Sequence, residues 1–329
     1  MAGQNWFTNA EGAFLSNDTL SEELRTVGQP MFRYRQFAKM EQKYGRKSGQ
    51  LFLFNRQSNL TAPLTGAYLS QNVPIPRYGV TFSQGTLTAR ESGNAIPWNE
   101  LFETFSEQEV KGQVIVNALV NDMAKQMDYR CAIEGVEGSD VVYTPTGTDA
   151  VPTATWSVTG TASTPATRRI QVYDIKEWRD AFDWGVYGSN TYAPAPRYDG
   201  ANFVMVGSVG ALRSIEDDPE WQNAQYYGDP EKLFSGEKGR IAGVRMVTDN
   251  HLAGRVNLNS ASHSLYTDEC TIFADDAMIE GSCIAEEVRD GIPSDFQRDM
   301  ASAWYTLCGF QNVWPVSAGD NRIIRVRST

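Results

Sequence analysis

The chain has 329 residues, of which 41% are hydrophobic and 21% charged, so it can bury a sizeable core and is not an intrinsically disordered chain. No run of about 18 apolar residues is present, which excludes a membrane-spanning helix, and the start lacks a secretory signal, so we expect synthesis in the cytoplasm. The net charge is −11, yet residues 1–100 hold 10 basic and 7 acidic residues, so a basic N-terminal part precedes an acidic body.

The first segment, up to residue 48, is predicted to be a loosely ordered arm. Between Arg25 and Lys47 it carries seven basic residues against the single acidic Glu41. Such an arm either binds nucleic acid or lies on the acidic body of a neighbouring copy, and charge alone does not decide between the two. Pro30 could begin a short helix that ends at Gly45, packed either on its own domain or elsewhere.

Residues 49–98 are predicted to form a long two-stranded hairpin. The run Leu51–Phe54 gives the first strand, Tyr78–Arg90 gives the second, and a turn-rich stretch separates them. The apolar positions of the second strand change parity at Gly85, which predicts a bulge or bend there. A lone hairpin is marginally stable in water, so it must lie on its own body or on another subunit. We favour a neighbour.

The clearest predicted helix follows the hairpin. Ser106 and Glu109 fit a capping box, and apolar residues then recur at helical spacing until Gly135. Its expected buried stripe is Val116, Val120, Met123 and Met127. A helix of more than about 20 residues is long for a globular protein, so we expect a spine on which other elements pack.

The remaining elements indicate an α+β class with a mixed sheet. A helix is expected after Asp174, with Trp178 and Phe182 on its buried face, and a strand at Phe203–Val206 leads to a helix capped by Ser208. Further strands are expected near Val244, at Thr271–Ala274 and at Arg322–Arg327, and helical spacing predicts a helix at Ser294–Leu307.

The search for catalytic chemistry finds no phosphate-binding loop, dinucleotide fingerprint or metalloprotease motif. The sequence therefore predicts no enzyme, no catalytic residue, no cofactor and no metal site. The acidic pairs Asp217–Asp218 and Asp275–Asp276 lack calcium-loop spacing and fit helix ends or turns better. Buried unreactive thiols and surface histidines are expected for Cys131, Cys270, Cys283, Cys308, His251 and His263.

Several segments resemble the major capsid proteins of tailed bacteriophages, in particular the coat family of the N-four-like podoviruses. They occur in the same order as in that family, over residues 36–329. The matching segments are Asn59–Thr65, Arg90–Trp98, Tyr143–Gly147, Asp217–Ala224, Tyr227–Glu231, Gly236–Glu237, Gly239–Ile241 and Gly243–Val244.

The resemblance implies the HK97-like phage capsid fold. Its parts would be an N-terminal arm at 1–48, an extended loop at 49–98 and a peripheral domain with the spine helix at 99–170. An axial domain would cover 171–318, and a C-terminal strand at 319–329 would return to the peripheral domain. The implied function is a structural subunit that self-assembles into the hexamers and pentamers of an icosahedral head around double-stranded DNA, in the virion, after assembly in the host bacterial cytoplasm.

The resemblance also implies which residues touch other subunits. Each extended loop would lie across a neighbour's spine helix and each basic arm beneath a neighbour. The expected loop contacts are Arg56, Tyr68, Arg77, Tyr78 and Phe82, and the expected arm contacts are Arg33, Arg35, Lys39 and Lys43.

Other expected partners are a separate scaffolding protein, a portal and decoration proteins. The scaffolding protein is expected to be separate because only about 48 residues precede the loop, where some relatives carry a fused scaffolding domain. No sequence-specific DNA contact and no membrane are expected. Some relatives join subunits through a loop lysine. Here no lysine lies between Lys47 and Lys111, and arginine is no such nucleophile, so we expect no covalent crosslink through the loop.

Two other functions fit parts of the sequence. A bacterial nanocompartment shell of the same fold would enclose a cargo enzyme instead of a genome. A soluble hydrolase or carbohydrate-binding domain could use some of the 8 tryptophans and 14 tyrosines to line a sugar groove.

Overall fold

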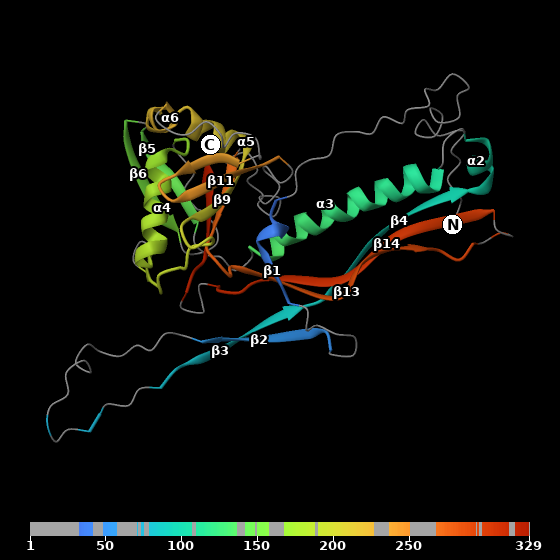
Figure 1. The fold of residues 1–329 in the computed structure, drawn as a ribbon, viewed down its shortest axis with the longest axis horizontal. Helices are drawn as coiled ribbons and strands as arrows, with labels where there is room; N and C mark the ends of the chain where they lie inside the picture. Colours follow the sequence, from blue (N-terminus) through green and yellow to red (C-terminus); the bar gives the residue numbers. More distant parts are fainter. Residues whose placement is uncertain are drawn as a thin grey trace.

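A computed structural model describes residues 33–41, 49–57, 79–106, 110–136, 142–148, 150–157, 168–187, 190–226, 237–250, 268–293, 298–315 and 320–328, with 71, 74, 75 and 295. Two parts lie side by side (Figure 1). The elongated part is a narrow four-stranded sheet with a long helix along it, and the compact part is a seven-stranded sheet with three helices.

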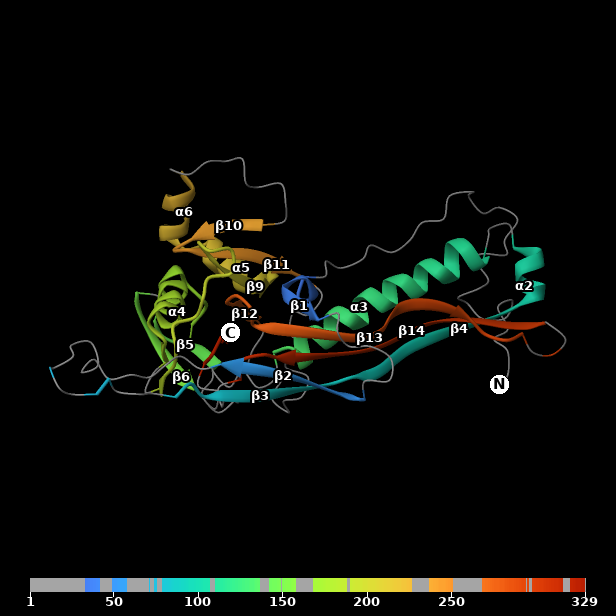
Figure 2. The same ribbon diagram turned by 60° about the horizontal axis from the view of Figure 1, so that its bottom comes forward.

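The elongated part is built from strands that are far apart in the sequence. β13 (Met278–Asp290) and β14 (Asp299–Asn312) are antiparallel, β4 (Arg90–Asn99) pairs with β14, and the short β1 (Ala38–Glu41) is parallel to β13 at the other edge. Helix α3 (Val116–Glu134) lies along one face of these strands, preceded by a π-helical turn at Val110–Ile115 (Figure 2). The short helix α2 (Glu100–Phe105) follows β4 at the distal end.

Helix α3 confirms the predicted spine, but its buried face differs from the prediction. Met127 is fully buried and Met123 partly so, whereas Val120 is 41% exposed and Leu119 is buried in its place. Trp304 of β14 packs in this layer and donates from its indole nitrogen to Asp122 on the helix, at 2.8 Å. The predicted capping residue Glu109 lies outside the described residues, and Ser106 ends α2 instead.

The compact part has the strand order β10-β11-β9-β12-β15-β5-β6. Its strands are β10 (Glu237–Ile241), β11 (Val244–Asp249), β9 (Phe203–Ser208), β12 (Asp268–Phe273), β15 (Ile323–Ser328), β5 (Val142–Thr148) and β6 (Val151–Ser157). All six residues of β9 are buried, as a central strand requires. Helices α4 (Val172–Trp184), α5 (Val209–Glu216) and α6 (Pro219–Tyr226) accompany the sheet, and a two-stranded ribbon of β7 (Val186–Tyr187) and β8 (Asn190–Thr191) follows α4.

The predicted helix after Asp174 is confirmed, although it begins earlier than expected. Gln171 is the N-cap, and the carboxylate of Asp174 accepts the Gln171 backbone N–H at 2.9 Å. Ile175, Trp178 and Phe182 form the buried face and belong to the core of the compact part.

The predicted cap of α5 is also confirmed, since the Ser208 hydroxyl oxygen accepts the backbone N–H of Ala211 at 3.2 Å. Replacing Ser208 by alanine should lower the free energy of unfolding by about 1 kcal/mol, because one N–H of the first turn loses its acceptor. Urea denaturation checks this, and an unchanged midpoint would mean that the cap contributes nothing.

The predicted hairpin is present as β2 (Leu51–Gln57) and β3 (Phe82–Thr88), paired in unbroken antiparallel register from Leu51 opposite Thr88 to Gln57 opposite Phe82. Of the bulge or bend expected at Gly85, the bulge is therefore wrong. The parity of the apolar residues changes because Phe82 lies on the exposed face of β3 and Leu87 on its buried face. A Cβ at Gly85 would collide with the ring of Phe54, so the glycine makes room for that ring within a regular strand.

Two further predictions are wrong. The helix expected at Ser294–Leu307 is β14, because Met300 and Trp304 share a strand face as well as a helix face when they are four residues apart. The helix expected from Pro30 to Gly45 is, where described, a single 3-10 turn at Arg35–Phe37 that leads into β1.

Neither sheet is built from one continuous stretch of sequence, contrary to the expected peripheral domain at 99–170 and axial domain at 171–318. β13 and β14, from range 171–318, stand beside β4, whereas β5 and β6, from range 99–170, stand in the compact part beside β15. Pairing between distant strands brings about this mixture.

Candidate subunit interface

The inner face of the β2–β3 hairpin rests on its own chain. Leu87 is fully buried in a small cluster with Ile279 and Val313, and the rings of Phe52 and Phe54 pack against that cluster. Gly281 and Gly309 allow this approach, since a Cβ at either would press on Leu87 or the backbone of Thr88. The base of the hairpin therefore has an intramolecular support, contrary to our expectation that it lies only on a neighbour.

The outer face of the hairpin carries three apolar side chains that are open to solvent, set among polar ones. Leu51, Leu53 and Phe82 lie on this face because of the strand register, and their side chains are 56%, 52% and 68% exposed. Thr88 and Thr86 lie opposite the two leucines, and the polar pair Asn55 and Gln84 separates the leucines from Phe82. Apolar side chains on both faces of one hairpin indicate that both faces are covered in the working state of the protein.

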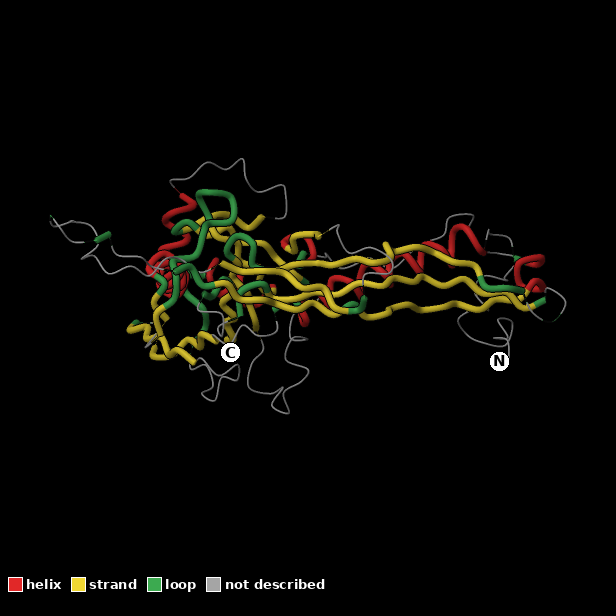
Figure 3. Tube along the Cα trace, turned by 90° about the horizontal axis from the view of Figure 1, so that it is seen from below, coloured by secondary structure: helices red, strands yellow, loops and turns green. Residues whose placement is uncertain are grey.

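A second open surface is the face of the four-stranded sheet that points away from α3. Side chains of β14 alternate, so that Trp304 and Thr306 are buried beneath α3 whereas Ala303 and Tyr305 lie on the other face. Figure 3, which views the molecule from below, shows the strands of the elongated part in front of the helix. We call this surface the open face.

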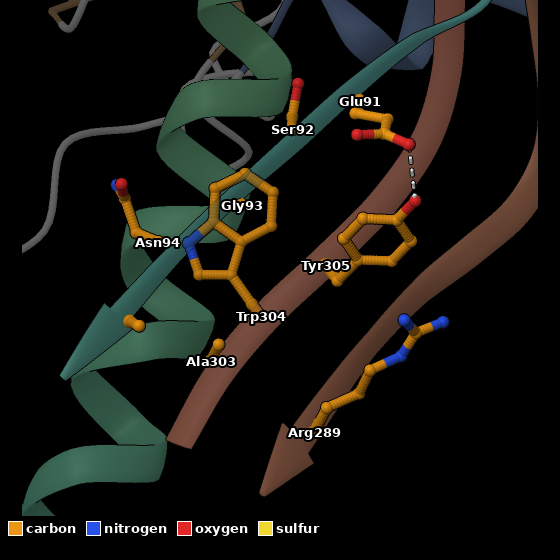
Figure 4. A pocket seen from close by; sticks show the side chains of 9 residues that line it. Glu91, Ser92, Gly93, Asn94, Arg289, Ala303, Trp304 and Tyr305 are labelled. Atoms are coloured by element: carbon orange, nitrogen blue, oxygen red, sulfur yellow. Dashed lines mark hydrogen bonds between the residues drawn. The ribbon is translucent and has the colours of Figure 1, made fainter. Parts of the chain in front are cut away.

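The open face contains a pocket of about 430 Å³ (Figure 4). Small residues form its floor, namely Gly93, Ala95 and Ala303, and Tyr305 stands at one side. A Cβ at Gly93 would collide with the carbonyl oxygen of Trp304, so the close approach of β4 to β14 requires a glycine there.

Polar side chains border this pocket and largely satisfy one another. The Tyr305 hydroxyl donates to Glu91 at 3.2 Å, and the Arg289 guanidinium stacks over the Tyr305 ring at 4.2 Å from its centroid. Arg289 also pairs with Glu287. The pocket is thus lined by aromatic and aliphatic groups, and the polar groups at its border already bond one another. Such a pocket suits an apolar side chain more than a reacting substrate.

The outer face of the hairpin and the open face lie on different parts of the molecule. Only Ala89 separates β3 from β4, so the hairpin extends toward the side of the compact part while β4 runs toward α2 (Figures 1 and 2). One chain's hairpin cannot reach its own distal open face. A contact between the two surfaces on different copies would be head-to-tail, and such contacts close into rings when the rotation permits.

The segment Arg33–Glu41 also contacts its own chain. The Arg35 guanidinium donates to Glu280 at 2.7 Å and pairs with Glu286, and Lys39 lies 3.6 Å from Asp276. Lys43 lies outside the described residues. Arg35 is thus engaged within the subunit, while the Lys39 side chain stays 65% exposed.

Of the predicted loop residues, Phe82 has the exposure expected of a contact residue, whereas Arg56 lies over the Phe54 ring of its own hairpin at 5.5 Å. Tyr68, Arg77 and Tyr78 lie outside the described residues. Sequence reasoning missed Leu51, Leu53 and the open face. The unbroken apolar run Leu51–Phe54 could have revealed the first two, because a strand that is apolar on both faces is covered on both.

Within the described residues, no group of three or more His, Cys, Asp or Glu side chains could hold a metal ion. Burial raises the pKa of the Cys308 thiol to about 11 and that of Cys131 well above its usual value, so both stay protonated. Cys270 is also buried, as expected, whereas Cys283 is half-buried, and His251 and His263 lie outside the described residues. Asp218 accepts the Glu220 N–H at 2.8 Å, which confirms a helix-end role for that acidic pair.

Trp98, Trp178, Trp221 and Trp304 are core residues and are therefore not open to a sugar, whereas Trp184 at the end of α4 is 76% exposed. Among the described helices, none has the length and apolarity needed to cross a membrane.

No protein-family model and no curated protein matches the chain. Solved structures do. The acid-stable capsid of Helicobacter pylori bacteriophage KHP30 has a TM-score of 0.64 at 13% identity, covering 100% of this chain and 98% of that one. The head of Helicobacter pylori bacteriophage KHP40 has a TM-score of 0.66 at 13% identity, and the capsid of Ralstonia phage GP4 has 0.66 at 10%, each covering 95% of both chains. Over nearly its whole length, the chain has the HK97-type fold of tailed-bacteriophage capsid proteins.

Proposed function

We propose that this chain is the major capsid protein of a tailed bacteriophage, a structural, non-enzymatic subunit of the virion. Copies would assemble in the host bacterial cytoplasm into hexamers and pentamers of an icosahedral head that encloses double-stranded DNA. The observation that carries this proposal is a full-length capsid fold with two uncovered, mutually suited surfaces at opposite ends of one chain.

Within such a ring, we propose that the outer face of each hairpin lies on the open face of the next copy. Leu51, Leu53 and Phe82 would cover the small residues of the open face, with Phe82 in the pocket beside Tyr305. This surface suits an apolar hairpin face, because small residues and the Tyr305 ring line a pocket there.

Charge supports the same contact. Between Gln42 and Arg90 the sequence contains no acidic residue, whereas the open face carries Glu91 and Glu287, the second of them paired with Arg289. Opposite charges steer two copies toward each other and disfavour hairpin-to-hairpin pairing. Arg77 and Tyr78 of the loop, and Arg33, Lys39 and Lys43 of the arm, are proposed as further contacts at the rim of such interfaces.

Several finer proposals rest on the resemblance of the sequence alone. They are membership of the N-four-like podovirus coat family, an N-terminal arm at 1–48 followed by an extended loop at 49–98, and partnership with a scaffolding protein, a portal and decoration proteins. The acidic body would hold packaged DNA weakly, because like charges repel. That property suits a genome that must leave the head.

Disulfide trapping tests the proposed contact. A chain with Phe82→Cys and Ala303→Cys should form intermolecular disulfides under mild oxidation and give a ladder of covalent oligomers that ends at the ring size. The matched control is Phe82→Cys with Asn117→Cys, which places the second thiol on α3. A ladder from the control alone would move the hairpin onto the spine helix, and no ladder from either would contradict a hairpin-mediated ring. Purified particles should contain DNA and no enzyme cargo, which separates a phage head from a nanocompartment.

A further inference from the structure

The segment Arg33–Glu41, called the arm segment below, is bonded to the elongated part of its own chain. Its backbone N–H at Arg35 donates to the carboxylate of Asp128 on α3 at 3.0 Å. The Arg35 side chain binds Glu280 of β13, and residues 38–41 extend the sheet by parallel pairing with Met278–Gly281.

The same segment is also packed on the compact part. The Tyr34 ring is 4% exposed and meets Phe273 of β12 edge-on, with 5.8 Å between centroids, while its hydroxyl lies 3.4 Å from the hydroxyl of Thr271. Phe37 stacks on Phe273 at 5.6 Å and meets Tyr198 at 5.5 Å. Nine residues therefore bridge α3 and β13 on one side and β12 on the other.

The bridge depends on a carboxylate that comes from another element. The 3-10 turn of the arm segment has Tyr34 at its N-cap without a side-chain cap of its own, and Asp128 supplies the acceptor instead. Asp128 is only 1% exposed. The charged and titratable groups around it are Arg33, Tyr34 and Arg35 of the arm segment, Cys131 of α3, Asp249 of β11, Glu269 of β12 and Glu280 of β13.

We propose that the arm segment is a strap that fastens the two parts of the subunit to each other, and that protonation of Asp128 tightens it. The strap covers Asp128, so lifting it would return this carboxylate to water. The free energy needed to ionise Asp128 therefore differs between the fastened and the lifted arrangement.

The sign of the pH effect follows from the difference in the pKa of Asp128 between the two arrangements. Burial, opposed in part by hydrogen bonds from the arm-segment backbone and assisted by the charge of Asp249, raises the pKa of Asp128 to about 6 in the fastened state. A solvated aspartate has an ordinary pKa near 4, so the fastened state binds the proton more tightly than the lifted state. Acidification from about pH 7.5 to about pH 5 should thus favour fastening roughly tenfold. Above pH 6 that advantage is lost.

In a shell, this strap would set how far the compact part can swing relative to the elongated part. That role rests on the proposed function, but the contact itself does not. We therefore place the test on the unassembled full-length chain at low concentration, where failure to form shells has no influence on the result.

Hydrogen exchange of residues 33–41, corrected for the intrinsic pH dependence of exchange, measures the opening of the strap. In the wild-type chain, protection should stay level down to about pH 6.5, begin to rise near pH 6 and be about tenfold higher at about pH 5. With Asp128→Asn, the neutral isostere, the step should vanish. Asp276→Asn is the matched control, because it removes the partly exposed carboxylate that pairs with Lys39 of the arm segment and should keep the pH-dependent rise.

Two results would overturn the proposal. One is a wild-type protection that stays flat or falls on acidification. The other is a step of unchanged size in the Asp128→Asn chain. Should that variant fail to fold, the wild-type curve decides alone, since a rise in protection that begins far from pH 6 assigns the response to another group.

Discussion

Replacing Phe82 by aspartate should leave a folded chain that no longer assembles into shells. Phe82 is 68% exposed on the isolated chain, so the fold does not depend on it. In the proposed ring its side chain is buried in the pocket of the next copy, and losing it removes about 2–3 kcal/mol per contact before the cost of burying a carboxylate is added. Since each 1.4 kcal/mol is about a factor of ten, the concentration needed for assembly should rise by about a hundredfold or more.

Phe82→Leu is the matched control for this experiment, because it keeps an apolar side chain of similar reach and should assemble. Sedimentation separates shells from free subunits, and circular dichroism verifies folding. Wild-type yields of closed shells from the Phe82→Asp chain would show that the outer face of the hairpin makes no essential contact.

The largest loss of stability is expected from Asp174→Asn. Asp174 and Arg168 form an ion pair whose side chains are 0% and 1% exposed, with two hydrogen bonds of 2.5 and 2.7 Å. Asparagine keeps the size of the side chain but leaves the Arg168 charge buried without its counter-charge. Removing one partner of such a pair costs about 3–5 kcal/mol.

Denaturant unfolding of the unassembled chain measures this effect. The matched control is Asp180→Asn, which breaks the exposed pair with Arg179 on the same helix and should cost less than about 1 kcal/mol. Equal losses of unfolding free energy from the two substitutions would contradict an extra cost of leaving the buried Arg168 charge without Asp174.

The elements with strong local signals could be predicted from the sequence. Helix α4 has a polar cap followed by Ile175, Trp178 and Phe182 at helical spacing, and Ser208 stands between a buried strand and an apolar helix face. The hairpin could be predicted as well, because the apolar runs at its two ends leave a turn-rich segment between them. In each case neighbouring residues carry the information.

The errors occur where tertiary contacts decide the structure. Met300 and Trp304 fit both a helix and a strand, and only pairing with β4 and β13 makes β14 a strand. Tyr34, Phe37 and Met40 of the arm segment recur at helical spacing, but Asp128 and the edge of β13 hold the segment as one turn and a strand. The open face joins β4 to β13 and β14 across about two hundred residues of sequence, so no local pattern could reveal its pocket.

Cryo-electron microscopy of the purified protein at high concentration tests the central claim most directly. The account predicts closed shells of pentameric and hexameric rings in which each hairpin lies on the open face of the adjacent copy, with density for Phe82 beside Tyr305. A chain that stays monomeric at that concentration, or shells in which Phe82 faces solvent and the open face is bare, would contradict it.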